Sequence, residues 1–299
     1  MTVTADGLDA ARVVEVGGIP MSALVRQVAQ PRAVIVALHG GAASARYFHH
    51  PGPRLSLLDT AAALGFTVLA IDRPGYGRSA PYESTMDSPD FRVGLAYATV
   101  DALLGDAPRG AGLFLFAHSA GSELTIRMAA AERGRDLLGI EVAGTGRHWH
   151  DRAAEIIASA QPGRPTGIQS ILWEPRELYP PESIGGRYFA GPGPAYEGAL
   201  LKTWSPRDFA LVAPQVSVPV QYTLGDHDHV WRNDPASMAD IAALFSASPR
   251  VLVNLQAHSG HNLSVGRTAA AYHLKVLSFV EECVVAHAER KVSTENIGR

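Results

Sequence analysis

A single serine stands between an apolar run and a helix-like pattern in LFLFAHSAGSELTIRMAAAERG, which runs from Leu113 to Gly134. The pentapeptide AHSAG around Ser119 has the form small–x–Ser–x–Gly, which is typical of a sharp strand-to-helix turn. Such a turn strains the backbone, exposes the serine Oγ above the sheet and needs small flanking residues. The strict pattern begins with glycine, and Ala117 stands in that place. We interpret Ser119 as a nucleophile, and the alternative interpretation is an ordinary helix cap.

A serine hydroxyl needs a base that takes its proton, and that base needs an acid that orients it. Among the twelve histidines, we favour His261 because AHSGHNLS follows an apolar strand and precedes the last helical pattern. His258, three residues earlier, is the near competitor. The strand-ending stretch YTLGDHDHVW offers two acids, Asp226 and Asp228, and the order serine, aspartate, histidine is the one expected for this topology. We favour Asp228 because it lies one step deeper in the loop.

The negative oxygen of an acyl-transfer intermediate needs two hydrogen-bond donors. We expect the amide of Ala120, which follows the serine, and the amide of Gly41 in the loop HGGAAS. Glycine at positions 40 and 41 lets the backbone approach a substrate closely, and a tight turn would also require it. His118 is next to Ser119 in the chain, and we expect the turn to direct its side chain away, into the edge of the core.

These residues need a scaffold, and the chain alternates apolar strands with helical patterns. Strands are expected at 13–16, 24–28, 33–38, 66–71, 112–117, 139–143, 216–225 and 250–256, and helices at 55–65, 90–104, 120–133, 235–245 and 267–287. Continuous apolar strands are typical of a parallel sheet that helices cover on both faces. Such sheets gather their functional loops at the carboxyl ends of the strands. We therefore predict an α/β fold with a mostly parallel central sheet, followed by a solvated tail from His287.

The alternation stops between residues 145 and 215. Ten of the chain's 20 prolines lie between Pro162 and Pro219, so that helices in this stretch should be short. We predict an inserted cap at 145–215, after the sixth strand, on a core domain formed by residues 1–144 and 216–299. Large aromatic side chains in the cap are expected to line the substrate pocket: Trp173, Tyr179, Tyr188, Phe189 and Trp204.

The composition fits a globular protein. Of 299 residues, 46% are hydrophobic and 18% are charged, and the net charge of −3 gives no indication of nucleic acid or a membrane surface as a partner. Cys283 is the single cysteine, which rules out an intrachain disulfide and agrees with a reducing compartment. The first residues lack the basic and apolar regions of a secretory signal. No apolar run approaches the roughly 18 residues of a membrane helix. We therefore expect a cytoplasmic protein.

Metal and nucleotide sites have weak support. GDHDHVW and the HWH at 148–150 are rich in histidine and aspartate, but no thiolate or zinc-binding helix motif accompanies them. The loop GGAASARYF lacks the lysine of a phosphate-binding loop, and no G-x-G-x-x-G follows a strand. We expect no metal and no cofactor.

The chain resembles the α/β-hydrolase superfamily in five motifs that keep the family's order. These are HGG at 39–41, DRPGYGRS at 72–79, AHSAG at 117–121, GDHD at 225–228 and SGHN at 259–262. The resemblance spans about residues 11–285 and implies the α/β-hydrolase fold with a serine hydrolase triad. In that family the acid is the last residue of G-x-x-D, which is Asp228 here. The DRPGYGRS loop usually shapes the pocket, so Asp72 is not expected to be catalytic.

The expected function is a cofactor-independent hydrolase of a carboxylic ester, lactone or thioester. Ser119 would attack the carbonyl, His261 would carry the proton to the leaving group, and Asp228 would orient His261. The expected partner is a small-molecule acyl ester or thioester, free or carrier-bound. Two alternatives stay open: a carbon–carbon bond hydrolase, and a non-hydrolytic use of the fold as a cofactor-free oxygenase, a lyase or a ligand-binding protein.

Overall fold

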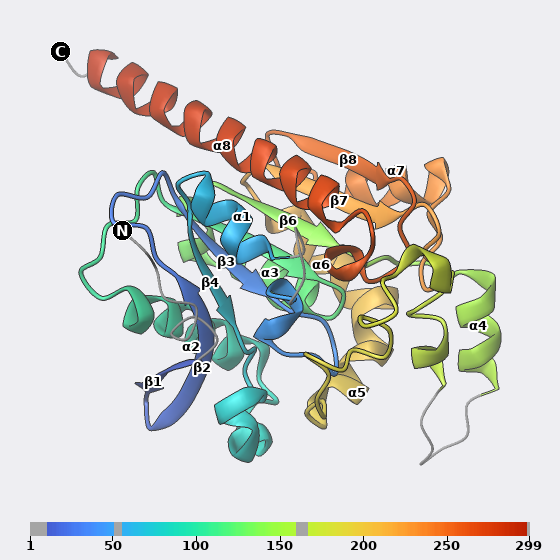
Figure 1. Cartoon of the computed structure of the whole chain (residues 1–299). Helices are drawn as coiled ribbons and strands as arrows, with labels where there is room; N and C mark the ends of the chain where they lie inside the picture. Colours follow the sequence, from blue (N-terminus) through green and yellow to red (C-terminus); the bar gives the residue numbers. More distant parts are fainter. Residues whose placement is uncertain (1–10, 51–55, 160–166, 298–299) are drawn as a thin grey trace.

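The computed structural model describes residues 11–50, 56–159 and 167–297. Its centre is an eight-stranded sheet with the order β1-β2-β4-β3-β5-β6-β7-β8 (Figure 1). The strands are β1 (Arg12–Val16), β2 (Ile19–Arg26), β3 (Val34–Leu38), β4 (Thr67–Ile71), β5 (Leu113–His118), β6 (Gly139–Ala143), β7 (Val220–Gly225) and β8 (Val251–Gln256). β2 pairs antiparallel with β1 and β4, and every pairing from β4 to β8 is parallel. The predicted mostly parallel sheet is therefore confirmed.

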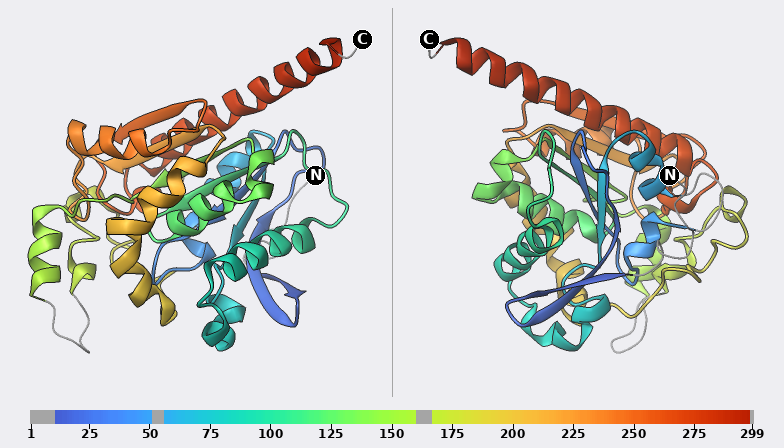
Figure 2. Two further views of the ribbon diagram at one scale, coloured as in Figure 1. Left: turned by 180° about the vertical axis from the view of Figure 1, so that it is seen from behind. Right: turned by 60° about the vertical axis from the view of Figure 1, so that its left-hand side comes forward.

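Helices cover both faces of this sheet (Figure 2). One face carries α1 (Leu57–Ala63) and α8 (Ala269–Ile297), and the other carries α2 (Pro89–Leu104), α3 (Gly121–Ala130), α6 (Phe209–Val212) and α7 (Pro235–Leu244). Successive side chains of a strand point to opposite faces. In β3, Val34 and Val36 therefore enter one hydrophobic core, whereas Ile35 and Ala37 enter the other. Burial on both faces explains why the central strands are continuous apolar runs.

Two helix ends differ from the sequence prediction. α3 ends at Ala130 instead of residue 133, and the chain continues as a 3₁₀ helix at Glu132–Asp136. A Cβ at Gly134 would lie only 2.3 Å from the Ala129 carbonyl oxygen, so the chain turns back closely against the end of α3. α8 continues to Ile297 instead of ending at residue 287, so the tail predicted from His287 is helical, and its residues 288–290 are exposed to solvent as predicted. Alanine, glutamate, arginine and lysine favour helix without an apolar face, which is why periodicity did not reveal this extension.

The segment from 145 to 215 follows the carboxyl end of β6. It contains α4 (Asp151–Ala158), α5 (Tyr196–Thr203), a π-helical turn (Trp204–Asp208) and α6. Short 3₁₀ helices lie at Ile168–Ser170, Arg176–Leu178 and Ala213–Gln215 in this segment, and at Ala45–Phe48, Gly77–Thr85 and Leu263–Val265 elsewhere. The elements are short, as its prolines predict. None of the described helices combines the length and apolar character that crossing a membrane requires.

Candidate active site

Ser119 lies at the turn between β5 and α3. Its φ is +51°, in the left-handed region that side-chain-bearing residues rarely adopt. The Ser119 amide donates a hydrogen bond to the Ala143 carbonyl over 2.7 Å, which anchors the turn to β6. A Cβ at Gly121 would lie 2.4 Å from the carbonyl oxygen of Leu38 and 2.6 Å from that of His39. The last glycine of AHSAG is therefore required because the helix start packs against the end of β3.

Three side chains from separate loops meet at this turn. His261 Nε2 lies 3.1 Å from Ser119 Oγ, and His261 Nδ1 lies 2.9 Å from Asp228 Oδ2. The loop after β8 carries the histidine, and the loop after β7 carries the aspartate. His261 is 2% exposed and Asp228 is 1% exposed, so solvent does not screen their interaction. The structure thus brings together the three residues that the sequence singled out.

Asp228 is held in its ionised form by its surroundings. Its Oδ1 accepts the backbone amides of Val230 at 2.7 Å and Trp231 at 3.3 Å. Burial alone would raise the pKa of Asp228, but His261 and these two amides outweigh it, so the pKa lies below its ordinary value. A carboxylate with both oxygens occupied is well placed to orient the imidazole.

The competing residues have other contacts. Asp226 accepts the amides of His258 and Ser259, each over 2.9 Å, and lies 2.7 Å from His227 Nδ1. It therefore stabilises the loop that precedes His261 and does not contact that histidine's ring. His258 is exposed. Among the described residues, no group of three or more His, Cys, Asp or Glu side chains is arranged to hold a metal ion.

The His118 side chain is buried next to His261, at the edge of the core as the sequence analysis predicts. Its Nε2 donates to the His261 carbonyl over 2.9 Å, and its ring stacks on Tyr47 with 4.5 Å between centroids. Burial, together with a smaller effect of the neighbouring His261, lowers the pKa of His118 to about 3. His118 is therefore neutral at physiological pH and positions the loop of His261 without adding a positive charge.

Gly41 and Ala120 flank the serine. A Cβ at Gly41 would lie 3.7 Å from the Ala120 Cβ, so the two backbone segments approach each other closely. A Cβ at Gly40 would lie 3.1 Å from the Ser119 Cβ. Glycine at these positions keeps space open beside Ser119.

Three side chains that the sequence analysis did not single out hold this glycine loop. Arg73 donates to the Gly40 carbonyl over 3.0 Å and forms an ion pair with Glu197 of α5 at 2.5 Å. The Tyr76 hydroxyl accepts the Ala42 amide over 3.0 Å and donates to Glu197 over 2.6 Å. The motif DRPGYGRS contains Arg73 and Tyr76, but no sequence signal marks Glu197 because it lies 124 residues from Arg73.

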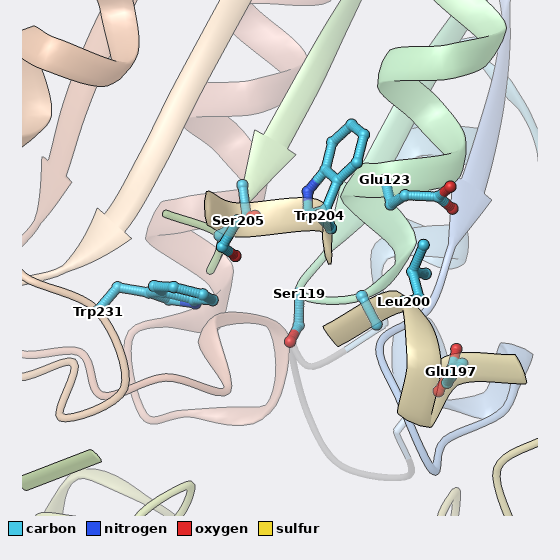
Figure 3. Close-up of a pocket in the computed structure, with 9 residues that line it drawn as sticks. Ser119, Glu123, Glu197, Leu200, Trp204, Ser205 and Trp231 are labelled. Atoms are coloured by element: carbon cyan, nitrogen blue, oxygen red, sulfur yellow. The ribbon is translucent and has the colours of Figure 1, made fainter. Parts of the chain in front are cut away.

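Two pockets meet at Ser119. The larger has a volume of about 250 Å³, and Trp173 and Phe189 line it, as predicted. The smaller has a volume of about 50 Å³, and Trp204 lines it, also as predicted (Figure 3). Tyr179 and Tyr188 line neither pocket, and their prediction as pocket residues is not supported.

The positions of these two tyrosines have simple physical reasons. Tyr179 is buried, and its hydroxyl accepts the Asn262 amide over 3.1 Å, so it holds the loop next to His261. Tyr188 is 41% exposed and packs edge-on against His50.

Comparisons with known proteins agree with this geometry. Residues 35–272 match the sequence profile of the alpha/beta hydrolase family. Similar solved structures include a lipase in its open form (17% identity, TM-score 0.65, covering 92% of this chain and 99% of that one). A second is the thioesterase domain from the curacin biosynthetic pathway (18% identity, TM-score 0.58, covering 91% of this chain and 98% of that one). A third is Est1E from Butyrivibrio proteoclasticus (16% identity, TM-score 0.57, covering 92% of this chain and 99% of that one).

At such identities the structural likeness shows the fold alone. None of the curated proteins compared with the chain matches it in sequence. The family match nevertheless covers most of the chain, and the sheet and helices are arranged as in these hydrolase structures. The chain belongs to the alpha/beta hydrolase family and has the α/β-hydrolase fold.

Proposed function

We propose that the protein is a serine hydrolase that cleaves carboxylic esters, lactones or thioesters through an acyl-enzyme. Ser119 is the nucleophile, His261 is the general base and then the general acid, and Asp228 orients His261. The observation that carries this proposal is the relay from Asp228 Oδ2 through His261 to Ser119 Oγ, with distances of 2.9 and 3.1 Å. Both lie within the hydrogen-bond range of about 2.6–3.2 Å that a general base and its orienting acid require.

The three side chains can carry out both proton transfers that the reaction needs. Asp228 Oδ2 accepts a hydrogen bond from the His261 Nδ1–H group, which keeps the proton on Nδ1 and leaves the Nε2 lone pair directed at Ser119. As Oγ attacks the carbonyl carbon, its proton moves to Nε2, and the imidazolium then returns that proton to the leaving oxygen or sulfur. Water repeats both steps on the acyl-enzyme and releases the acid. The negative charge of Asp228 stabilises the imidazolium, and the neutral His118 beside it adds no repulsion.

We assign the oxyanion site to the amides of Gly41 and Ala120. Their support is their place on either side of Ser119, together with the hydrogen bonds through which Arg73 and Tyr76 hold the glycine loop. Preorganised donors of this kind stabilise charge that develops in the transition state.

We further propose that residues 145–215 act as a cap that selects the substrate. This segment contributes Trp173 and Phe189 to the larger pocket and Trp204 to the smaller one. The substrate is then a small acyl ester or thioester, free or attached to a carrier.

The test uses a fluorophosphonate probe, which phosphonylates an activated serine, together with hydrolysis of p-nitrophenyl acetate and an acyl thioester. The wild type should be labelled, and Ser119→Ala should be unlabelled with kcat lower by on the order of 10⁶-fold. Ser122→Ala is the matched control, because Ser122 is a buried serine in the first turn of α3, directly after the Ser119 turn, and its hydroxyl donates to the Ala143 carbonyl. An unlabelled wild type, or labelling that survives Ser119→Ala, would refute the proposal.

A further inference from the structure

The nucleophile lies where two pockets of unequal size meet. Ser119 borders both the pocket of about 50 Å³ and the pocket of about 250 Å³. Ala120 and Trp204 border only the smaller pocket, whereas His261 and Trp173 border only the larger one. The two sides of the scissile bond therefore face different surroundings. The inference that follows rests on the proposed function of Ser119 and His261.

Proton transfer decides which side of the substrate enters which pocket. The leaving oxygen or sulfur must reach the proton on His261 Nε2, since this group acts as the general acid. His261 borders the larger pocket and not the smaller one, so the leaving group extends into the larger pocket. The acyl chain, on the opposite side of the carbonyl carbon, then enters the smaller pocket beside Ala120.

The smaller pocket limits the length of the acyl chain. A water-sized group needs roughly 10–15 Å³ of such a volume, so about 50 Å³ holds about three to five of them. Leu200, Trp204 and Trp231 form its apolar walls (Figure 3). A longer chain would have to displace these side chains, and packed interiors resist added volume.

Trp204 brings one polar group without a partner to the wall of the smaller pocket. Trp204 is 6% exposed, and its indole Nε1 is buried without a hydrogen-bond partner among the described residues. A buried N–H group without a partner is costly, which points to an acceptor that arrives with the ligand. The neighbouring Ser205 side chain also lines this pocket, because the π-helical turn directs both consecutive residues inward (Figure 3). Such turns are rare and are frequent at functional sites.

The charged groups at the smaller pocket are already neutralised. Glu123 accepts hydrogen bonds from Arg92 at 3.1 Å and from Arg127 at 2.5 Å. Glu197 is paired with Arg73 in the same way. A charged ligand group would find no free counter-ion on these side chains, whereas an uncharged oxygen needs only the indole N–H.

We propose that this hydrolase selects short acyl groups, with about three to five heavy atoms beyond the carbonyl carbon, that carry an uncharged acceptor oxygen bound by Trp204 Nε1–H. Trp204 is therefore a specificity-determining residue. The larger pocket accommodates the alcohol or thiol of the leaving group.

The test compares p-nitrophenyl esters that share one leaving group. Butanoate is paired with methoxyacetate, and pentanoate with 3-methoxypropanoate, so that each ether replaces one methylene by oxygen. The ether-to-hydrocarbon ratio of kcat/KM is measured for the wild type and for Trp204→Phe. Dividing the wild-type ratio by the Trp204→Phe ratio cancels the difference in intrinsic reactivity between the ether ester and the hydrocarbon ester. Phenylalanine keeps an aromatic ring to stack on Phe209 and loses the N–H donor together with part of the indole's volume. The two esters of a pair have nearly the same size, so the change in volume affects both rates alike and cancels in the ratio.

In at least one pair of esters, the ether-to-hydrocarbon ratio of kcat/KM should be about five- to tenfold higher in the wild type than in Trp204→Phe. This factor corresponds to the loss of one hydrogen bond. Octanoate should react roughly ten- to a hundredfold more slowly than butanoate. Trp173→Phe is the matched control in the larger pocket and should leave the ether preference unchanged. Ser205→Ala, a second variant in the smaller pocket, keeps the indole N–H and should therefore retain the ether preference.

Fluorophosphonate labelling distinguishes a failure of the acyl-pocket proposal from a failure of the hydrolase proposal. If Ser119 is labelled and p-nitrophenyl acetate is hydrolysed, but both pairs show the same ratio in the wild type and Trp204→Phe, the acyl-pocket proposal is wrong and the hydrolase proposal stands. Equal rates for octanoate and butanoate would also overturn it, as would an ether preference that responds to Trp173→Phe instead. Absence of labelling would overturn the hydrolase proposal itself.

Discussion

Removing the carboxylate of Glu197 should both destabilise the protein and slow its reaction. Glu197 of α5 contacts Arg73 and Tyr76, which in turn bind the Gly40 carbonyl and the Ala42 amide. The 145–215 segment is thus connected to the glycine loop beside the nucleophile. We choose Glu197→Ala as the perturbation and Glu197→Gln as the variant that keeps the shape but not the charge.

The magnitude follows from the burial of this ion pair. The Arg73 side chain is 1% exposed and the Glu197 side chain 12% exposed. Burial alone would lower the pKa of Arg73, yet the Glu197 carboxylate outweighs it and the pKa is raised. Removing one partner of a buried pair leaves the other charge uncompensated and costs about 3–5 kcal/mol. For a chain of this size we expect a melting temperature about 5–10 °C lower.

The effect on the reaction should appear in kcat. Loss of an oxyanion donor costs about 10²–10³-fold, and a loosened glycine loop should cost less, about tenfold. Hydrolysis of p-nitrophenyl acetate and thermal melting are measured together. Glu182→Gln is the matched control, since Glu182 is an exposed carboxylate on the same segment. The double variant Arg73→Met/Glu197→Leu should regain much of the stability without regaining kcat.

A Glu197→Ala protein that melts within about 2 °C of the wild type and retains its kcat would show that Glu197 does not stabilise the glycine loop. Effects of Glu182→Gln as large as those of Glu197→Ala would lead to the same conclusion. Glu197→Gln should lie between the wild type and Glu197→Ala, because its amide oxygen can still accept one hydrogen bond.

Three further predictions concern other parts of the molecule. Gly121→Ala should melt at least about 10 °C lower by calorimetry, because its Cβ would meet backbone at 2.4 Å. Gly94→Ala, at an exposed position in α2 with open space around it, should stabilise by about 0.5–1 kcal/mol, and equal melting of the two variants would contradict the packing argument. Asp228→Asn should lower kcat by on the order of 10³–10⁴-fold and Asp226→Asn by less than about tenfold, and the reverse order would exchange their roles. Burial raises the pKa of Glu141 from 4.5 to about 8, so the folded protein keeps a proton that the unfolded chain loses. The free energy of unfolding should therefore fall as pH rises from about 4.5 to 8, and Glu141→Gln should flatten this decline in melting curves, whereas equal slopes would refute the assignment.

The amino-acid sequence alone was sufficient to predict the sheet, most helices and the three residues that meet at the nucleophile. These features depend on local patterns. Apolar runs mark strands that are buried on both faces, and a tight turn needs small residues around Ser119. Because parallel strands end at one edge, residues after β5, β7 and β8 were expected to meet even though they are far apart in the chain.

Helix ends and pocket residues were harder to predict for physical reasons. The extension of α8 to Ile297 depends on helix propensity without an apolar face, which periodicity does not detect. Five aromatic residues were equally plausible pocket residues, since composition says nothing of the direction of a side chain. The fold directs Trp204 into the smaller pocket and uses Tyr179 to hold the Asn262 amide.

Long-range partners were decided by tertiary structure alone. Glu197 meets Arg73 only because α5 packs against the loop after β4, and nothing near either residue in the sequence indicates the pair. The choice between Asp228 and Asp226 had rested on position in the loop, and the structure gives it a physical reason: Asp228 contacts His261, while Asp226 is occupied by the amides of His258 and Ser259. The sequence by itself determined which reactive side chains gather around Ser119, whereas the folded structure decided which surfaces surround them, because side-chain packing depends on residues that are distant in the chain.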